Sequence, residues 1–114
     1  MVVRRGSIFY VNLGKRIGSV QSGVRPVLVI QNNIGNRYSP TCIGVPITGR
    51  GNKRGLITHK VLEGYDFLIN TSTALVEQIL TFDKSQIIDY IGDINAKDLT
   101  DINQKIGISL GLKN

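Results

Sequence analysis

An arginine stands directly before a proline where an aliphatic run begins, in the stretch SGVRPVLVI from Ser22 to Ile30. Burying its guanidinium group without a partner would be costly, so we expect Arg25 to stay at the rim of the core. Pro26 and the strand behind it would hold it there. Its five N–H donors form a planar fork that suits phosphate oxygens. Arg25 is therefore either an ordinary strand-end cation or an anion clamp.

Thr48 is the second candidate, because it ends the predicted strand TCIGVPIT and enters the basic stretch GRGNKRG. Its hydroxyl is expected beside Arg50, Lys53 and Arg54, which would attract an anionic ligand such as nucleic acid. A solvated hairpin tip explains the same residues, and threonine is common at strand ends.

His59 and Glu77 complete the set of side chains that could move a proton. His59 is the only histidine, and its side chain titrates near neutral pH. Glu77 and Gln78 interrupt the apolar run in LVEQI, which costs stability unless they are exposed or functional. A surface histidine and a surface ion pair are the alternative interpretations.

Several other chemistries do not fit these residues. One histidine and one cysteine cannot build a structural zinc site. Eight scattered acidic residues argue against a two-metal nuclease. Neither a phosphate-binding P-loop nor a nucleophile-elbow serine is present. We therefore predict a site without a metal and without a cofactor.

The whole chain of 114 residues has the size of one domain, 1–114, with a formal net charge of +6 and a pI near 9.8. Such a basic chain attracts nucleic acid, an anionic membrane or an acidic protein segment. The lone Cys42 suits a reducing compartment. No apolar run is long enough for a signal peptide or a membrane span. We expect a cytoplasmic protein.

Glycine-rich turns separate the segments with strand patterns, and 32–40 is predicted to be a loop. Pro26 fits the first position of its strand, and Pro46 indicates an edge strand or a bulge. A turn of helix is expected at 83–87. Strands are expected at 7–13, 26–31, 41–48, 56–62, 66–71 and 88–94, with a sharply bent extended segment at 73–82.

The C-terminal segment has a helical pattern. Asn95 can serve as N-cap, and Asp98 lies in the first turn near the positive end of the helix dipole. Four apolar residues then recur at helical spacing: Leu99, Ile102, Ile106 and Leu110. The fold class expected is mainly β with a terminal α-helix (α+β), as a small, strongly bent antiparallel β-barrel.

Three stretches are informative about the family. In chain order they are RRGSIFYVNL, GSVQSGVRPVLVIQNNIGNRYSPT and VEQILTFDK, and the predicted terminal helix follows them. In this arrangement the chain resembles the MazF/PemK family of toxin endoribonucleases, from Val3 to Leu112. The resemblance implies a PemK/CcdB-like barrel, a homodimer, and sequence-specific cleavage of single-stranded RNA (mRNA) without metal. It also implies a cognate MazE-like antitoxin, whose acidic tail would suit a basic groove.

In that family the arginine of the Gly-x-Arg-Pro motif and a threonine ending the third strand form the catalytic pair. The matching positions are Arg25 and Thr48. The implied reaction is attack by the ribose 2′-hydroxyl, giving a 2′,3′-cyclic phosphate and a 5′-hydroxyl end. The general base stays open between His59 and Glu77. Many members have glutamate where this chain has Val20, so that role is absent or has moved to Glu77.

RNA contacts are expected from the 14–24 loop and from the basic stretch. The residues assigned to RNA binding are Ser19, Gln21, Arg50, Lys53, Arg54, His59 and Gln78. An unpaired base also needs an apolar surface, for which Ile17, Val20 and Leu56 are candidates.

Two alternatives belong to different functional classes. A toxin of the same architecture that poisons DNA gyrase would grip its target with the terminal helix and would not need Arg25. The absence of tryptophan and the ending GLKN argue against it. A non-catalytic barrel would bind nucleic acid in a salt-sensitive way without cutting it.

Overall fold

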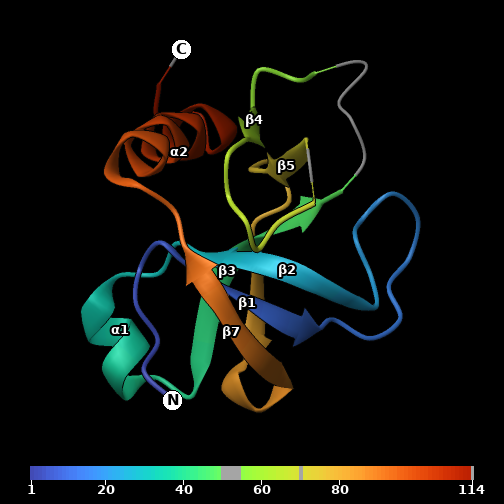
Figure 1. Cartoon of the computed structure of the whole chain (residues 1–114), viewed down its shortest axis with the longest axis vertical. Helices are drawn as coiled ribbons and strands as arrows, with labels where there is room; N and C mark the ends of the chain where they lie inside the picture. The colour runs from blue at the N-terminus through green and yellow to red at the C-terminus, as the bar shows by residue number, and fades with distance from the viewer. Residues whose placement is uncertain (50–54, 70, 114) are drawn as a thin grey trace.

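The computed structural model describes residues 1–49, 55–69 and 71–113. All strand pairs are antiparallel, and the sheet order is β4-β5-β3-β2-β1-β7, with β6 paired to β3 off this path. The strands are β1 (Ser7–Asn12), β2 (Val24–Val29), β3 (Thr41–Thr48), β4 (His59–Leu62), β5 (Ser72–Leu75), β6 (Leu80–Asp83) and β7 (Ile87–Asp93). Two α-helices, α1 (Asn33–Tyr38) and α2 (Ala96–Ser109), and a 3₁₀ turn, η1 (Lys84–Gln86), complete the fold (Figure 1).

The predicted fold class, mainly antiparallel β with a terminal α-helix, is confirmed, but the predicted β-barrel is wrong, because the sheet stays open. In the described part of the chain, β4 and β7 end the sheet and do not pair with each other. The cause lies in β3, which divides one edge between two strands. Residues 41–44 pair with β6, and residues 47–48 pair with β5. The sheet therefore forks at β3 instead of closing on itself.

Both prolines occupy positions other than those predicted. β2 begins at Val24, so Pro26 is its third residue and Arg25 lies inside the strand, opposite Val11. Pro46 lies in a central strand, not at an edge, and faces Val27 of β2. It falls where β3 passes from β6 to β5, so its missing N–H coincides with the gap between those partners.

Strands at 7–12, 41–48 and 87–93 confirm the alternating patterns, and η1 confirms the single helical turn at 83–87. The 32–40 loop instead contains α1, which Asn32 caps by accepting from the Gly35 N–H at 2.8 Å. The strand predicted at 66–71 is wrong for residues 66–69, which form a turn followed by a bend and irregular chain. The bent segment 73–82 divides into β5 and β6 around a turn at Val76 and Glu77.

Alternation along the strands creates two apolar clusters on opposite sides of the sheet. Ile8, Leu28, Val45 and Ile47 lie on the side that α2 covers, where Ile102 is fully buried. Phe9, Val11, Val27, Val29 and Phe82 form the other cluster. In Figure 1, α2 lies at the end of the molecule that carries β4 and β5. None of the described helices is long and apolar enough to span a membrane.

Helix α2 begins and ends with capping residues. Asn95 accepts from the Asp98 N–H at 2.8 Å, as its position predicted. At the other end Gly111 adopts φ 75°, and the Leu112 N–H donates to the Gly107 carbonyl at 2.7 Å. This is a Schellman ending, which favours glycine because of the positive φ. Gly111 therefore terminates the helix instead of weakening it.

An ionic cluster fastens α2 to β4. The Lys60 ammonium lies 2.8 Å from Asp101 and 3.4 Å from Asp98. The Tyr65 hydroxyl donates to Asp98 at 2.5 Å and accepts from the Asn95 N–H at 3.0 Å. Hydrogen bonding to Asp101 is the main cause of the raised pKa of Lys60, which is charged at neutral pH. This cluster fixes the helix against the strand that carries His59.

Candidate active site

Arg25 is positioned by β2 and by the loop before it. The strand pairs it with Val11 of β1, and its Nε–H donates to the Ser22 carbonyl at 3.0 Å. Its side chain is half-buried. The contact with Ser22 fixes the base of the guanidinium group through Nε. Arg25 thus lies near the beginning of β2, as its second residue and not ahead of the strand.

The β2–β3 pairing ends at Val27 and Pro46, and its register, if continued, would bring Thr48 opposite Arg25. β2 and β3 pair Val27 with Pro46, and two further residues along each strand lead to Arg25 and Thr48. Residues opposite each other in an antiparallel pair project to the same side of the sheet. On its other side Thr48 pairs with Thr73 of β5. We call the side of the sheet that carries Val11, Arg25, Thr48 and Thr73 the site face.

A largely apolar hollow of about 230 Å³ borders Arg25. Both neighbours of Thr48, Ile47 and Gly49, also line it. The remaining lining residues are Tyr10, Val24, Pro26, Phe67, Leu68, Ile69 and Ser72. Because strand residues alternate, Pro26 and Ile47 project away from the site face, and Arg25 forms the rim between that face and the hollow. An anion held by Arg25 would therefore have an apolar surface beside it.

The apolar surface is not the one expected from the sequence. Ile17, Val20 and Leu56 are exposed and do not line the hollow. Phe67, Leu68 and Ile69 line it instead, from the segment that was predicted as a strand. Their signal in the sequence is an apolar triplet directly after the turn-forming residues GYD.

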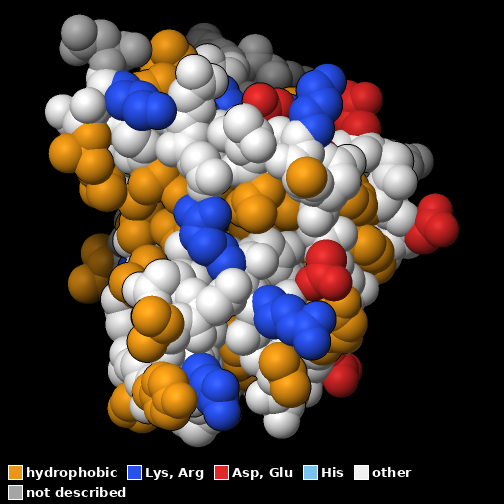
Figure 2. Space-filling model, turned by 90° about the vertical axis from the view of Figure 1, so that its left-hand side faces the viewer, with side chains coloured by type: hydrophobic (Ala, Val, Ile, Leu, Met, Phe, Trp, Pro, Cys, Tyr) orange, Lys and Arg blue, Asp and Glu red, His pale blue; other side chains and the backbone are white. Residues whose placement is uncertain are grey.

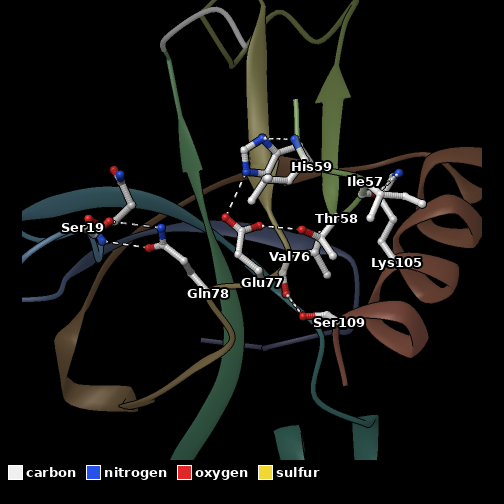
Figure 3. Close-up of polar contacts among 11 residues, drawn as sticks. Ser19, Ile57, Thr58, His59, Val76, Glu77, Gln78, Lys105 and Ser109 are labelled. Carbon is white, nitrogen blue, oxygen red and sulfur yellow. Dashed lines mark hydrogen bonds and ion pairs between the residues drawn. The ribbon is translucent and has the colours of Figure 1, made fainter. Parts of the chain in front are cut away.

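The 14–23 loop folds back onto the β5–β6 turn. Gln78 makes both contacts: its Oε1 accepts from the Gln21 N–H at 2.9 Å, and its Nε2 donates to the Ser19 carbonyl at 3.3 Å (Figure 3). The Gly23 N–H closes the loop base by donating to the Gly14 carbonyl at 2.8 Å. Three of the predicted RNA-binding residues, Ser19, Gln21 and Gln78, are thereby joined.

Glu77 and His59 form a second polar group. One Glu77 oxygen lies 2.9 Å from His59 Nε2, and the other accepts from the Thr58 hydroxyl at 3.0 Å (Figure 3). The Leu56 N–H donates to His59 Nδ1 at 3.4 Å. With Nδ1 as acceptor, the neutral ring carries its proton on Nε2 and donates it to Glu77. Sequence analysis did not identify Thr58 as part of this group.

The surroundings of Glu77 stabilise its ionised carboxylate. Burial favours the protonated form, but the Glu77 backbone N–H, His59 and Thr58 all hydrogen-bond the carboxylate, and together they hold its pKa below the ordinary value of 4.5. Glu77 is therefore ionised at neutral pH. Both ring nitrogens of His59 take part in hydrogen bonds, Nε2 with Glu77 and Nδ1 with the Leu56 N–H.

His59 and Thr48 lie on the same face of the sheet. His59 pairs with Leu75 of β5, and Thr73, the partner of Thr48, lies two residues further along that strand. Side chains two residues apart project to the same side, about 7 Å apart along the strand.

Among the predicted RNA-binding residues, Arg50, Lys53 and Arg54 lie outside the described residues.

Two buried side-chain atoms in the described part of the chain have no hydrogen-bond partner, Gln21 Oε1 and Thr73 Oγ1. Both come from residues next to the candidate site, one in the loop held by Gln78 and one opposite Thr48. Unsatisfied buried polar atoms are rare in folded proteins and call for a physical reason.

Across the described residues, no three histidine, cysteine or acidic side chains gather as a metal would require.

Residues 4–110 match the family described as PemK-like, MazF-like toxin of type II toxin-antitoxin system. The chain belongs to the PemK/MazF toxin family. It is 41% identical over 112 residues to endoribonuclease MazF of Staphylococcus saprophyticus, covering 97% of this chain and 93% of that one. It is 42% identical over 114 residues to endoribonuclease EndoA of Bacillus subtilis, covering 98% and 97%.

Solved structures of the family share the fold. MazF from Deinococcus radiodurans superposes with a TM-score of 0.83 at 22% identity, covering 97% of this chain and 98% of that one. A mycobacterial endoribonuclease in complex with its cognate antitoxin gives a TM-score of 0.76 at 24% identity, covering 96% and 94%. These structures confirm the fold, and the family match with the two relatives above confirms the predicted family.

Proposed function

We propose that this PemK/MazF-family toxin is an endoribonuclease that cleaves single-stranded RNA, with Arg25 and Thr48 acting on the scissile phosphate. The observation that supports the proposal is the β2–β3 register, which would bring the two residues opposite each other if it continued two residues beyond the Val27–Pro46 pair. The names of the two full-length relatives, both endoribonucleases, support the same activity.

The reaction begins with the ribose 2′-hydroxyl, which loses its proton and attacks the adjacent phosphorus. Negative charge then grows on the non-bridging oxygens. The Arg25 guanidinium and the Thr48 hydroxyl stabilise that charge by donating hydrogen bonds. The nucleophile belongs to the substrate, so the chemistry is specific for RNA and needs no metal-bound water.

Of the two candidate bases, Glu77 takes the 2′-hydroxyl proton, because His59 already carries a proton on Nε2. The lowered pKa of Glu77 keeps the carboxylate ionised at neutral pH, and two donors hold it in place. His59, whose Nε2 proton points to that carboxylate, orients it. The 5′ oxygen takes a proton as its bond to phosphorus breaks. Arg25 can donate this proton, because an alkoxide is a stronger base than guanidine.

RNA reaches the site along the 14–23 loop. Ser19, Gln21 and Gln78 present backbone and amide groups to the bases, and the basic stretch Arg50, Lys53 and Arg54 attracts the backbone. An unpaired base next to the scissile phosphate enters the apolar hollow beside Arg25 and rests against Phe67. The bases that the loop accepts would make cleavage sequence-specific.

The active form is a homodimer, and a cognate antitoxin neutralises it by laying an acidic segment in the RNA site. The +6 net charge supports such a partner. So do the solved complexes of similar toxins, a mycobacterial endoribonuclease with its cognate antitoxin and the Deinococcus radiodurans MazE–MazF pair.

Incubating the purified chain with a long RNA in EDTA and mapping the new 5′ ends tests the proposal. We expect cuts at one short sequence, with 5′-hydroxyl and 2′,3′-cyclic phosphate ends. A single 2′-deoxy nucleotide at the cut position should abolish that cut. Salt-sensitive binding without scission would indicate the non-catalytic barrel. Gyrase inhibition without scission would indicate the gyrase poison.

A further inference from the structure

Thr73 is the most deeply buried polar side chain next to the proposed catalytic pair. It is 1% exposed, and its Oγ1 has no hydrogen-bond partner. A buried hydroxyl without a partner loses its hydration and gains nothing in return. Valine has the same shape without the hydroxyl, and it favours strands equally well. The hydroxyl therefore needs an explanation other than packing.

The position of Thr73 supplies that explanation. It pairs directly with Thr48 in the β3–β5 ladder, so both side chains project to the site face. Directly opposed residues hold their Cβ atoms about 4.5 to 5.5 Å apart, within reach of a hydroxyl–hydroxyl contact after one rotamer change. Thr73 is too buried to touch an RNA phosphate itself.

We propose that Thr73 is a positioning residue for Thr48, which rests on the proposed function of Arg25 and Thr48. When RNA occupies the site, the Thr73 hydroxyl turns and donates to Thr48 Oγ1. Thr48 then directs its own O–H toward the phosphate. A hydroxyl that accepts one hydrogen bond donates a stronger second one. The Thr73 hydroxyl, which lacks a hydrogen bond in the free protein, gains one only at this step.

The opposite predictions for stability and activity make the proposal testable. Thr73→Val removes an unsatisfied hydroxyl, so the melting temperature should stay the same or rise. The single-turnover cleavage rate should nevertheless fall about tenfold, the effect of losing one hydrogen bond in the transition state. RNA affinity should stay unchanged, because Thr73 does not touch the substrate. Thr73→Ser keeps the hydroxyl and should retain most of the wild-type rate.

A double-mutant cycle separates positioning through Thr48 from a general effect. In a Thr48→Ala background, Thr73→Val should change the residual rate no further, because the residue it positions is gone. Thr100→Val is the control. It removes a hydroxyl that donates to the Ala96 carbonyl at an exposed position of α2, and the variant should cleave RNA at the wild-type rate.

A wild-type cleavage rate for Thr73→Val would overturn this inference while the proposed function stands. Equal losses in Thr73→Val and Thr73→Ser, with lowered melting temperatures, would assign Thr73 a packing role and also overturn it. Failure of the proposed function looks different, because the unmodified chain would then cut no RNA at all.

Discussion

Arg25 draws its proposed role from residues distant in the sequence. The Ser22 carbonyl holds its Nε, Val11 lies opposite on one side, and the continued β2–β3 register would bring Thr48 opposite on the other. A guanidinium held through Nε can still donate from its terminal nitrogens. The same arginine on a mobile loop would lose side-chain entropy each time it bound a phosphate.

Glu77→Gln tests whether the carboxylate is held as an anion. The pKa of Glu77 is lowered in the folded chain, so the carboxylate stabilises the fold above the ordinary value of 4.5. That contribution is lost as the pH falls through the lowered value. We expect the difference in unfolding free energy between wild type and variant to be constant from pH 7 to about pH 5 and to shrink below pH 4.

Urea denaturation across that pH range measures the difference. Glu63→Gln, at an exposed glutamate, is the matched control. If Glu77→Gln and Glu63→Gln show the same pH dependence, the hydrogen bonds from Thr58 and His59 do not hold the Glu77 anion.

At the scale of elements, Gln78 connects the β5–β6 turn to the 14–23 loop. Gln78→Leu removes both contacts, to the Gln21 N–H and to the Ser19 carbonyl. We expect faster hydrogen exchange at the Gln21 amide and roughly tenfold weaker RNA binding, the value of about one hydrogen-bonded contact plus loop ordering. The melting temperature should change little, because the loop is exposed.

Gln86→Leu is the matched control for that variant. Gln86 also bonds two backbone groups, the Asp83 N–H and the Asn12 carbonyl, but at the η1 turn. Unchanged exchange at Gln21 in the Gln78 variant would show that other contacts hold the loop.

Gly92→Ala tests how β7 supports the hollow. A Cβ at Gly92 would lie 2.4 Å from Cε2 of Phe67, so the ring must move. Phe67 lines the hollow beside Arg25, and its displacement should weaken RNA binding. Such overpacking costs about 1–3 kcal/mol of unfolding free energy. In the Gly92→Ala/Phe67→Leu double variant the clash is relieved, so stability should partly return; a fully additive loss would contradict the contact.

Local patterns predicted the elements well where alternation or capping was unambiguous. Thr41–Thr48 and the helix capped by Asn95 are confirmed at their ends. The strand at 66–71 failed because an apolar run alone does not distinguish a strand from turns that cover a core edge. The closed barrel failed because the fork at β3 depends on two pairings between distant segments.

The site could be predicted only in part. Arg25 and Thr48 carry motif signals, and the continued β2–β3 register would bring them opposite each other. Thr58 and Thr73 carry none, because such hydroxyls are common in strands, and the apolar triplet that contains Phe67 fits a strand as well as it fits a turn. Their importance appears only when the sheet places Thr73 beside Thr48 and the 67–69 segment beside Arg25.

At the scale of the whole molecule, positive charge extends beyond the candidate site. Figure 2 shows one face on which Lys and Arg side chains are spread among apolar ones, with acidic groups mostly toward one side. A chain of net charge +6 should attract RNA broadly and select it at the site. This charge distribution favours fast, salt-sensitive association with RNA over tight binding at a single surface site.

The proposed homodimer is tested by light scattering on the purified chain. Val24 and Ile69 are exposed apolar side chains at the rim of the hollow, where a second copy would pack along the edge and leave the hollow open to an RNA base. We expect twice the 12.5 kDa chain mass. Val24→Asp should give the single-chain mass with the far-ultraviolet circular dichroism unchanged. A monomer at micromolar concentration in the wild type would contradict the dimer.

The most direct test of the account is the single-turnover cleavage rate of Arg25→Ala on an RNA that the wild type cuts in EDTA. Loss of one donor to the charged transition state should lower the rate about a hundredfold to a thousandfold. The circular dichroism spectrum and melting temperature should match the wild type. Cleavage by the folded variant at the wild-type rate would show that Arg25 does not act on the phosphate, and the account would fail.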